Sequence, residues 1–303
     1  MLNAKPNSKA GNNMKKIKLS NNTKGILYII AAAFGFSLMT FFVKLSGDVP
    51  TMQKAFFRNA FAAIVATILV LKSDAKFKIK KENYSDLFFR CLFGTSGLIC
   101  NFYAVDHLNI ADANMLNKLS PFFAILISIP LLKEIPNSFD IFSVLIAFIG
   151  ALFIIRPFST SISLMPALLG LYGGFGAGTA YAFVRKLGKK RERTEIIVLI
   201  FSLFSSLVTL PFLIFNYSPM TLKQLFLLIL AGIFAAIGQL GITSAYKYAP
   251  AKNISVFDYT QVIFAALLGI MFLGEIPVLL SIIGYIIIIS AAILRWRVNL
   301  KNE

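Results

Sequence analysis

Residues 251–277 read AKNISVFDYTQVIFAALLGIMFLGEIP, a segment that is apolar enough to cross a lipid bilayer. A polar run from Asp258 to Gln261 lies well inside it, where unpaired polar groups are costly. At an offset of 141 positions, residues 110–136 read IADANMLNKLSPFFAILISIPLLKEIP and end in the same Glu-Ile-Pro triplet. Lys118 lies within the polar cluster of this earlier segment. The two segments therefore predict a membrane protein whose sequence is duplicated.

The same offset relates most of the chain to itself without a gap. The matched pairs include Gly35 with Gly176, Lys44 with Arg185, Gly97 with Gly238, Ala104 with Ala245, and Arg156 with Arg297. An apolar sequence gives some matches by chance, but a constant offset across several segments is hard to obtain in that way. We therefore expect two repeats, residues 24–155 and residues 164–298.

The composition is that of an integral membrane protein. Of the 303 residues, 57% are hydrophobic, and the mean hydropathy is +0.77, far above that of a soluble domain. The net charge is +17, but the basic residues fall in short loops between apolar segments, which argues against a nucleic-acid partner. Cys91, Cys100 and the single histidine, His107, form neither a disulfide framework nor a multi-histidine metal site. We expect no metal and no cofactor.

A membrane crossing takes about 20 helical residues. Ten segments meet this length and predict an all-α integral membrane fold with ten transmembrane helices. They are residues 24–45, 51–72, 86–106, 111–132, 138–155, 164–187, 195–217, 222–247, 251–273 and 278–298. Two polar tails flank them, residues 1–23, which we expect to be disordered, and residues 299–303.

The distribution of Lys and Arg predicts the orientation in the membrane. With the N-terminus in the cytoplasm, 24 of the 30 basic residues lie on the cytoplasmic side. Arg90 is counted among them, as part of the connection between the second and third helices. An even number of helices returns the C-terminus to the cytoplasm. Because each repeat has five helices, the second repeat enters the membrane from the opposite side, so the repeats are inverted. Inverted repeats are typical of secondary transporters.

Three short motifs resemble a known family. The second predicted helix contains FFRNAF at residues 56–61, and the repeats end in LLKEIP at 131–136 and FLGEIP at 272–277. With ten helices in two repeats, these motifs make the chain similar to the EamA branch of the drug/metabolite transporter superfamily. The resemblance covers residues 24–298 and implies a carrier for small organic solutes. It also implies a central cavity lined mainly by the first, third, fourth, sixth, eighth and ninth helices.

Asp258 and Lys118 are the charged candidates for substrate binding. Asp258 could contact a substrate cation or carry a coupling proton, and Lys118 could bind a substrate carboxylate or phosphate. The alternative is a structural ion pair between them, because they lie at similar depths in mate helices. The sequence leaves both interpretations open.

Further polar and aromatic residues on the expected lining helices are candidate substrate contacts. They are Asn117, Gln261, Tyr259, Tyr103, Asn101, Tyr172 and Gln239. Neighbouring positions on a helix point in different directions, so not all of these side chains can face one cavity. Pro121 lies near the middle of its helix, and we expect it to bend that helix.

A third group of residues is expected to have gating or structural roles. The group contains Arg58 in FFRNAF, Glu134 and Glu275 at the ends of the repeats, and Gly170, Gly174 and Gly178. The glycines recur every four residues on one face, a pattern that lets helices approach closely in a membrane. The glutamates either latch gates or lie at solvated helix ends.

These features predict a secondary active transporter that moves a small organic metabolite across the inner membrane by alternating access. An amino acid or a related cationic or zwitterionic solute is expected first, since Asp258 and Lys118 offer both signs of charge. The alternatives are an S-adenosylmethionine, nucleoside or vitamin carrier, a lipid flippase, or an intramembrane lipid-modifying enzyme. An enzyme would need clustered acids or histidines within the bilayer, so we expect no catalysis. The expected partners are the substrate, the bilayer, and a coupling proton or a counter-substrate.

Overall fold

The computed structural model describes residues 20–73, 77, 79–133, 138–155, 164–249 and 254–301. The first repeat contains α1 (Asn21–Leu45), α2 (Thr51–Leu71), η1 (Lys81–Asn83), α3 (Tyr84–His107), α4 (Ile110–Asn117), α5 (Ser120–Leu132) and α6 (Ser138–Ile155). The second contains α7 (Leu164–Lys189), α8 (Thr194–Phe215), α9 (Leu222–Tyr248), η2 (Ser255–Tyr259), α11 (Thr260–Leu268), the π-helical η3 (Gly269–Leu273) and α12 (Leu279–Lys301). Residues 21–23, which the sequence assigns to the disordered tail, belong to α1, where the Ser20 side chain accepts a hydrogen bond from the Thr23 amide and caps the helix.

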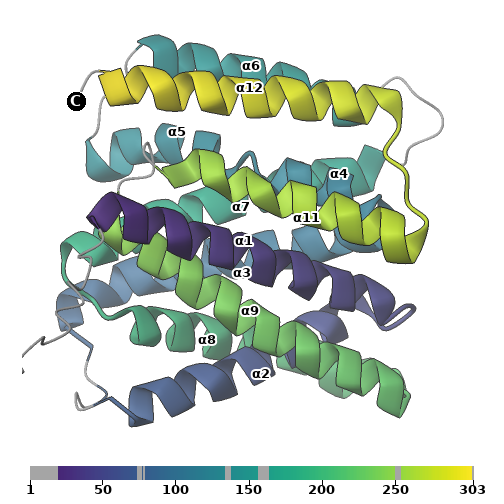
Figure 1. Cartoon of the computed structure of the whole chain (residues 1–303). Helices are drawn as coiled ribbons and strands as arrows, with labels where there is room; N and C mark the ends of the chain where they lie inside the picture. Colours follow the sequence, from purple (N-terminus) through teal and green to yellow (C-terminus); the bar gives the residue numbers. More distant parts are fainter. Residues whose placement is uncertain are drawn as a thin grey trace, which may run out of the picture.

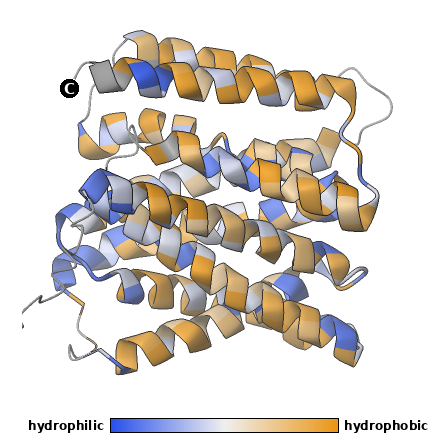
Figure 2. Cartoon of the chain, in the orientation of Figure 1, coloured by the Kyte–Doolittle hydropathy of each residue, from blue (hydrophilic) through white to orange (hydrophobic). Residues whose placement is uncertain are grey.

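The described helices have the lengths and hydropathy of membrane spans. Nine spans in the described part of the chain are long and apolar enough to cross a bilayer, and α6 adds a tenth with a shorter apolar stretch, Ile141–Ile154. Figure 2 shows hydrophobic residues along the middle of the bundle and polar residues gathered toward its two ends. α1 begins and α12 ends at the same end of the bundle (Figure 1), as an even number of crossings requires. The predicted all-α membrane fold is confirmed.

The two repeats pack against each other in helix pairs that an internal two-fold axis relates. α1 packs along α9, and in the same way α7, the mate of α1, packs along α3, the mate of α9. α2 packs against its own mate α8, and α6 against its own mate α12. Figure 1 shows α6 and α12 at one edge of the bundle and α2 and α8 at the opposite edge. Because each of these pairs joins the two repeats, the repeats form one bundle.

Glycines allow the closest of these helix crossings. A Cβ atom on Gly35 of α1 would lie 2.9 Å from the backbone nitrogen of Gly238 in α9. A Cβ atom on Gly97 of α3 would lie 3.0 Å from the Cα of Gly176 in α7. Gly35 and Gly176 are matched by the offset of 141, and so are Gly97 and Gly238. The duplicated sequence therefore builds the same close contact twice, as expected where van der Waals packing holds membrane helices together.

The outward faces of the bundle are apolar. Large exposed hydrophobic side chains occur on most helices, and examples are Ile68, Leu145, Leu152, Leu207 and Leu267. A soluble protein rarely exposes so much contiguous apolar surface. The interior is instead rich in small residues such as Ala32, Ala62, Ala104 and Ala235, all fully buried. Large apolar side chains on the outside fit a lipid-facing surface, and small side chains on the inside fit a closely packed interior.

Two predicted spans are broken where their polar clusters lie. The predicted helix over residues 111–132 separates into α4 and α5 with Lys118 in the break, and Pro121 lies in the first turn of α5. A residue without an amide hydrogen is tolerated at that place in a helix. The mate over residues 251–273 consists of η2, α11 and η3 in succession. The expectation of two continuous helices was wrong, because Asp258 lies in η2, ahead of α11, and not inside an α-helix.

Candidate functional site

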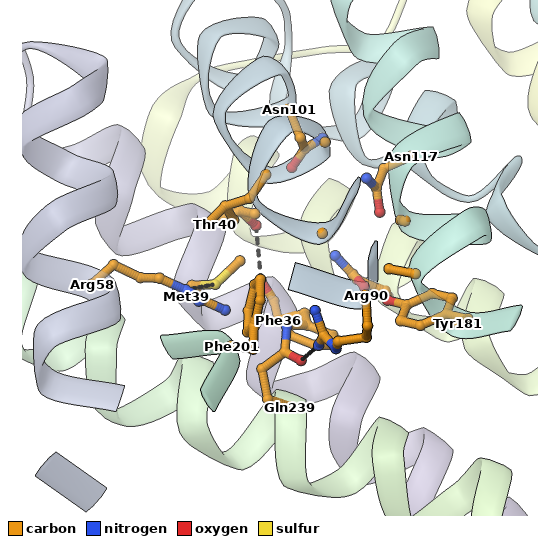
Figure 3. Close-up of a pocket in the computed structure, with 16 residues that line it drawn as sticks. Phe36, Met39, Thr40, Arg58, Arg90, Asn101, Asn117, Tyr181, Phe201 and Gln239 are labelled. Atoms are coloured by element: carbon orange, nitrogen blue, oxygen red, sulfur yellow. Dashed lines mark hydrogen bonds between the residues drawn. The ribbon is translucent and has the colours of Figure 1, made fainter. Parts of the chain in front are cut away.

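A small polar pocket lies where the two repeats meet (Figure 3). Four helices of each repeat line it, namely α1, α2, α3 and α4 of the first and α7, α8, α9 and α11 of the second. Its polar side chains are Thr40, Arg58, Arg90, Asn101, Asn117, Tyr181, Gln239 and Gln261. The open volume is about 60 Å³, which is room for a few water molecules and is too small for a molecule of the size of a metabolite.

Two buried arginines give this pocket a positive charge. Arg58 of α2 is fully buried, and Arg90 of α3 is 2% exposed. Arg58 donates from Nε to the Met39 sulfur at 3.3 Å and from Nη1 to the Asn59 side-chain oxygen. Arg90 donates from Nη2 to the Gln239 side-chain oxygen at 3.0 Å. Among the described residues, neither guanidinium has a carboxylate partner.

Neutral amides surround the remaining part of the pocket. The Gln261 side chain donates to the Asn114 side-chain oxygen, and Asn114 donates to the backbone oxygen of Ile110 at 2.7 Å. The Asn101 side chain donates to the Ala113 backbone oxygen at 3.4 Å. Hydrogen bonds of this kind position polar side chains without adding charge. The pocket therefore combines two cations with uncharged donors and acceptors.

Lys118 and Asp258 form an ion pair beside the breaks in α4–α5 and η2–α11. The Lys118 Nζ lies 2.7 Å from the Asp258 Oδ2, and both side chains are almost fully buried. The ion pair that the sequence left open as one alternative is therefore present. Neither residue is among those that line the pocket. A buried pair of opposite charges neutralises itself, so it leaves the charge of the two arginines uncompensated.

The other predicted substrate contacts divide into two groups. Asn101, Asn117, Gln239 and Gln261 line the pocket, together with Arg58, which the sequence assigns to gating or structure. Tyr259, Tyr103 and Tyr172 lie outside it. Tyr259 is buried in the apolar cluster that α12 helps to form, Tyr103 stacks on His107, and the Tyr172 hydroxyl lies 3.1 Å from the Ser96 hydroxyl.

The glycine face of α7 packs against the break between α4 and α5. A Cβ atom on Gly174 would lie 2.6 Å from the backbone oxygen of Leu116, and one on Gly178 would overlap the backbone oxygen of Ser120. One on Gly170 would lie 3.0 Å from the Leu116 side chain. At these three positions the glycines therefore lie on a closely packed face of α7. They bring α7 against the part of the chain that carries Lys118.

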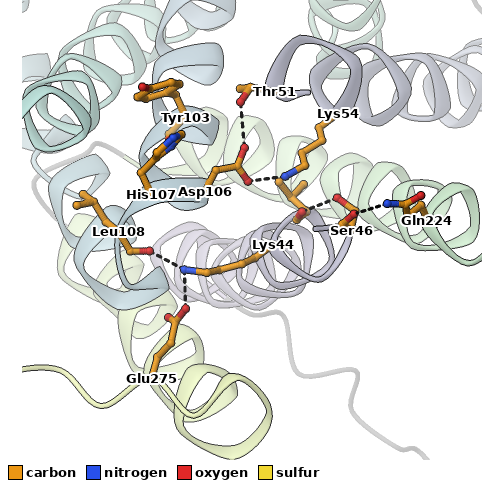
Figure 4. A network of polar contacts seen from close by, with 11 residues as sticks. Lys44, Ser46, Thr51, Lys54, Tyr103, Asp106, His107, Leu108, Gln224 and Glu275 are labelled. Atoms are coloured by element: carbon orange, nitrogen blue, oxygen red, sulfur yellow. Dashed lines mark hydrogen bonds and ion pairs between the residues drawn. The ribbon is translucent and has the colours of Figure 1, made fainter. Parts of the chain in front are cut away.

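A polar network closes one end of the bundle, the end at which α1 terminates (Figure 4). Lys44 lies 2.5 Å from the Glu275 carboxylate, which also accepts the Ile110 amide at 2.8 Å. Lys54 lies 2.5 Å from the Asp106 carboxylate. These contacts connect α1 to the segment after η3 and α2 to α3. The other predicted gating glutamate, Glu134, lies outside the described residues.

Arg90 is the pocket residue that sequence reasoning missed. Its assignment to a cytoplasmic connection was wrong, because the structure buries it in α3 with its guanidinium in the pocket. The signal was available, since Arg90 lies within the predicted span over residues 86–106. An arginine within a membrane segment is a functional candidate until a partner is found.

Comparison with known proteins agrees with this architecture. Residues 23–156 and residues 164–296 each match the EamA-like transporter family, and the two matches begin 141 positions apart. The chain is 34% identical over 272 residues to the pseudopaline exporter CntI of Pseudomonas aeruginosa, covering 89% of this chain and 94% of that protein. It is 26% identical over 296 residues to solute carrier family 35 member G1 of Homo sapiens, covering 91% of this chain and 81% of that protein.

A solved crystal structure supports the fold independently. It has 16% sequence identity and a TM-score of 0.62, and the match covers 86% of this chain and 96% of that one. At this identity the likeness concerns the fold alone. The family match spans both repeats and nearly all the described helices. The chain therefore belongs to the EamA-like transporter family, as a membrane transporter built from two repeats.

Proposed function

We propose that the protein is a secondary transporter that exports a small organic metabolite through the pocket between its repeats. The observation that carries this proposal is a charged and polar pocket enclosed by four helices of each inverted repeat. Two similar halves around one site can exchange outward-open and inward-open shapes. The direction of transport is taken from the relative named as a pseudopaline exporter.

The charge of the pocket narrows the class of substrate. Arg58 and Arg90 line it, and no Asp or Glu is among the described residues that do so. The carboxylate of Asp258 is already paired with Lys118. A solute with an acidic group, either zwitterionic or anionic, is therefore favoured over a cationic one. Pseudopaline and amino acids are the first compounds to test.

The proposed placement is the inner membrane, with both ends of the chain in the cytoplasm and a proton or counter-substrate gradient as the driving force. The excess of Lys and Arg in the connections on that side supports this orientation. The burial of Arg90 removes one residue from that count and leaves the bias intact. In this orientation the Lys44–Glu275 contact lies at the outer end of the bundle.

The test of transport is counterflow into proteoliposomes. Vesicles loaded with unlabelled pseudopaline or amino acid should accumulate the labelled compound, and the recovered compound should be chemically unchanged. Replacing Ala177, which lines the pocket, with Phe should abolish the accumulation, because the ring fills the small open volume. Protein-free vesicles are the control. Scrambling of a labelled lipid without solute counterflow would identify a flippase instead, and conversion of the solute would identify an enzyme.

Ion pairs at the two ends of the bundle are the proposed gates. At the outer end, Lys44 contacts Glu275 at 2.5 Å. At the opposite end, Asp86 of α3 contacts Lys186 at 2.9 Å and Lys190 at 2.7 Å near the end of α7. Alternating access requires the contacts at one end to open while those at the other hold. Weakening one end should therefore shift the population toward the state that is open at that end.

Glu275→Gln should favour the outward-open state. The substitution keeps the shape of the side chain and removes its charge, which weakens a partly exposed ion pair by about 1 kcal/mol. That loss corresponds to about a fivefold shift in population. The readout is the labelling rate, from outside, of a cysteine placed at Thr40, in a background where Cys91 and Cys100 are Ser. Thr40 lies in the pocket one helical turn from Lys44.

The control for this prediction is Asp48→Asn. Asp48 is exposed at the same end of the bundle, so the variant loses the same charge without touching Lys44. Faster labelling in Glu275→Gln but not in Asp48→Asn supports the gate. Equal rates in all three proteins would assign Glu275 to an ordinary helix end.

A further inference from the structure

We infer that Arg58 and Arg90, which share the aromatic ring of Phe201, form a binding site for two carboxylate groups of one transported molecule. This two-arginine site deepens the proposed function and rests on it, because it assigns a substrate class to the same pocket. A dicarboxylate occupies the site, and each arginine receives one of its acidic groups.

The first support for this inference is geometric. The guanidinium carbon of Arg90 lies 3.8 Å from the centre of the Phe201 ring, and that of Arg58 lies 5.9 Å from the same point. The two guanidinium carbons therefore cannot be farther apart than the total of these two distances. They come from different helices, α2 and α3, and Phe201 comes from α8. Figure 3 shows both side chains reaching into the pocket from different sides of it.

The second support is that no carboxylate among the described residues pairs with Arg58 or Arg90. A cation held over an aromatic ring gains some stabilisation, but a buried charge in a membrane protein ordinarily has a charged partner or a wet cavity. The Arg58 Nη2 and the Arg90 Nε are buried and have no hydrogen-bond partner among the described residues. Both groups are donors only. The pocket thus presents unused donors on two cations, which is what an anionic ligand requires.

The third support is the space that the chain leaves around Arg90. Gly94 lies one turn after Arg90 in α3, and a Cβ atom there would overlap the Arg90 Nη1 and lie 3.0 Å from the Phe201 ring. A glycine at this position therefore lets the guanidinium lie between its own helix and Phe201. The side chain is held in the pocket by this packing and by the hydrogen bond to Gln239. A side chain that is held in place before the ligand arrives loses little conformational entropy on binding, and this raises the affinity for the ligand.

The arrangement favours two carboxylates over one compact anion. A guanidinium presents parallel N–H donors that match the two oxygens of a carboxylate. Because Arg58 and Arg90 approach from different helices, a ligand with an acidic group at each end can satisfy both. The uncharged amides of Asn101, Asn117 and Gln261 then remain for the middle of the molecule.

Thermal unfolding of the purified protein in detergent tests this site without any transport step. The probes are succinate, glutarate, adipate, butyrate, inorganic phosphate and putrescine at equal ionic strength. At least one dicarboxylate should raise the melting temperature more than butyrate and phosphate do, because a ligand that binds only the folded protein stabilises it. Putrescine should not raise it. The site is wrong if no dicarboxylate raises the melting temperature, or if butyrate, phosphate or putrescine gives the largest rise.

Three variants test whether the rise in melting temperature with a dicarboxylate depends on the two arginines. Arg58→Gln and Arg90→Gln should each weaken dicarboxylate binding about tenfold or more, because each removes charge-assisted hydrogen bonds. Gln239→Glu places a carboxylate within hydrogen-bond distance of Arg90, so it should raise the melting temperature of the ligand-free protein and reduce the dicarboxylate response. Gln224→Glu is its control, since Gln224 does not line the pocket and a glutamate preserves the capping box at the start of α9. This control loses one hydrogen bond, from the Gln224 side chain to the Ser46 backbone oxygen.

The outcomes separate this inference from the proposed function. A dicarboxylate response that survives in both arginine variants and in Gln239→Glu overturns the two-arginine site, even if counterflow is observed. A response that disappears in these variants and persists in Gln224→Glu supports the site, even if no compound gives counterflow. If the arginine variants do not fold, the dicarboxylate response of Gln239→Glu still tests the two-arginine site, because this variant retains both arginines.

Discussion

Lys118→Met should destabilise the folded protein by about 3–5 kcal/mol, the usual result of removing one partner from a buried ion pair. The Asp258 carboxylate would remain almost fully buried beside the break in its helix, 2.7 Å from where the ammonium was. Apart from Lys118, no described residue donates a hydrogen bond to the Asp258 oxygens, so little else there can stabilise the charge. The measurement is the free energy of unfolding in a detergent titration.

Replacing both partners should restore most of this stability. In Lys118→Met with Asp258→Leu, two apolar side chains of similar volume fill the site, and such replacements of a buried pair are often neutral or stabilising. The control is Lys223→Met, since Lys223 is exposed in the first turn of α9. A double variant as unstable as the single variant would contradict the account of the pair as self-neutralising.

Transport by the double variant separates the two roles that the sequence left open for this pair. We expect counterflow to persist, because neither residue lines the pocket. Loss of counterflow in a stable double variant would instead assign Asp258 or Lys118 to substrate or proton coupling. Stability is measured on the same preparation, so an unfolded protein cannot be mistaken for an inactive one.

The overall architecture was predictable because it depends on a repeated pattern and on segment length. The offset of 141 fixes which helices are mates, and the odd number of helices in each repeat fixes their inversion. The packing of α1 with α9 and of α3 with α7 follows that symmetry. Neither argument depends on the direction in which any one side chain points.

The breaks in the two polar spans were not predictable from hydropathy. A window of about 20 residues averages Lys118 with its apolar neighbours and therefore reports one continuous helix. Tertiary contacts reach the backbone close to the second break. The Ser37 hydroxyl donates to the backbone oxygen of Gln261, in the first turn of α11, at 2.9 Å. The Ser37 partner lies more than 200 positions away in the chain, beyond any local pattern.

The composition of the pocket was predictable only in part, for a related reason. Asn101 and Gln239 were found because they are polar residues on expected lining helices, yet Tyr103 and Tyr172 satisfy the same criterion and lie elsewhere. Which face of a helix turns inward depends on its packing partners. Arg90 was missed because a count of basic residues near helix ends takes no account of depth. Its contact with Phe201 joins residues that are distant in the sequence.

Gly176→Ala should destabilise the protein by about 1–3 kcal/mol, the usual effect of inserting a methyl group into a closely packed interior. The new Cβ would lie 2.7 Å from the Cα of Gly97 and from the backbone oxygen of Phe93. Both atoms belong to the backbone of α3, so no side chain can rotate away, and the whole helix must shift. Alanine favours helix formation over glycine by about 1 kcal/mol, which offsets only part of this effect.

Gly188→Ala provides the matched control within the same helix. None of the described residues lies within 4 Å of a Cβ atom at Gly188, so this variant should be neutral or slightly more stable because it gains helix propensity alone. Thermal unfolding of both variants under identical conditions isolates the crossing with α3. A Gly176→Ala protein as stable as Gly188→Ala would mean that α3 and α7 separate at little cost.

The duplicated sequence makes the same prediction a second time. Gly35 matches Gly176, and a Cβ atom on Gly35 would lie 2.9 Å from the Gly238 nitrogen and 3.0 Å from the Phe234 oxygen. Gly35→Ala should therefore lower the melting temperature to a similar extent. We expect similar losses of melting temperature at the two crossings if the α1–α9 pair and the α3–α7 pair both stay in contact while the ends of the bundle open in turn. A large loss at one crossing and none at the other would show that the two repeats do not contribute equally to the folded state.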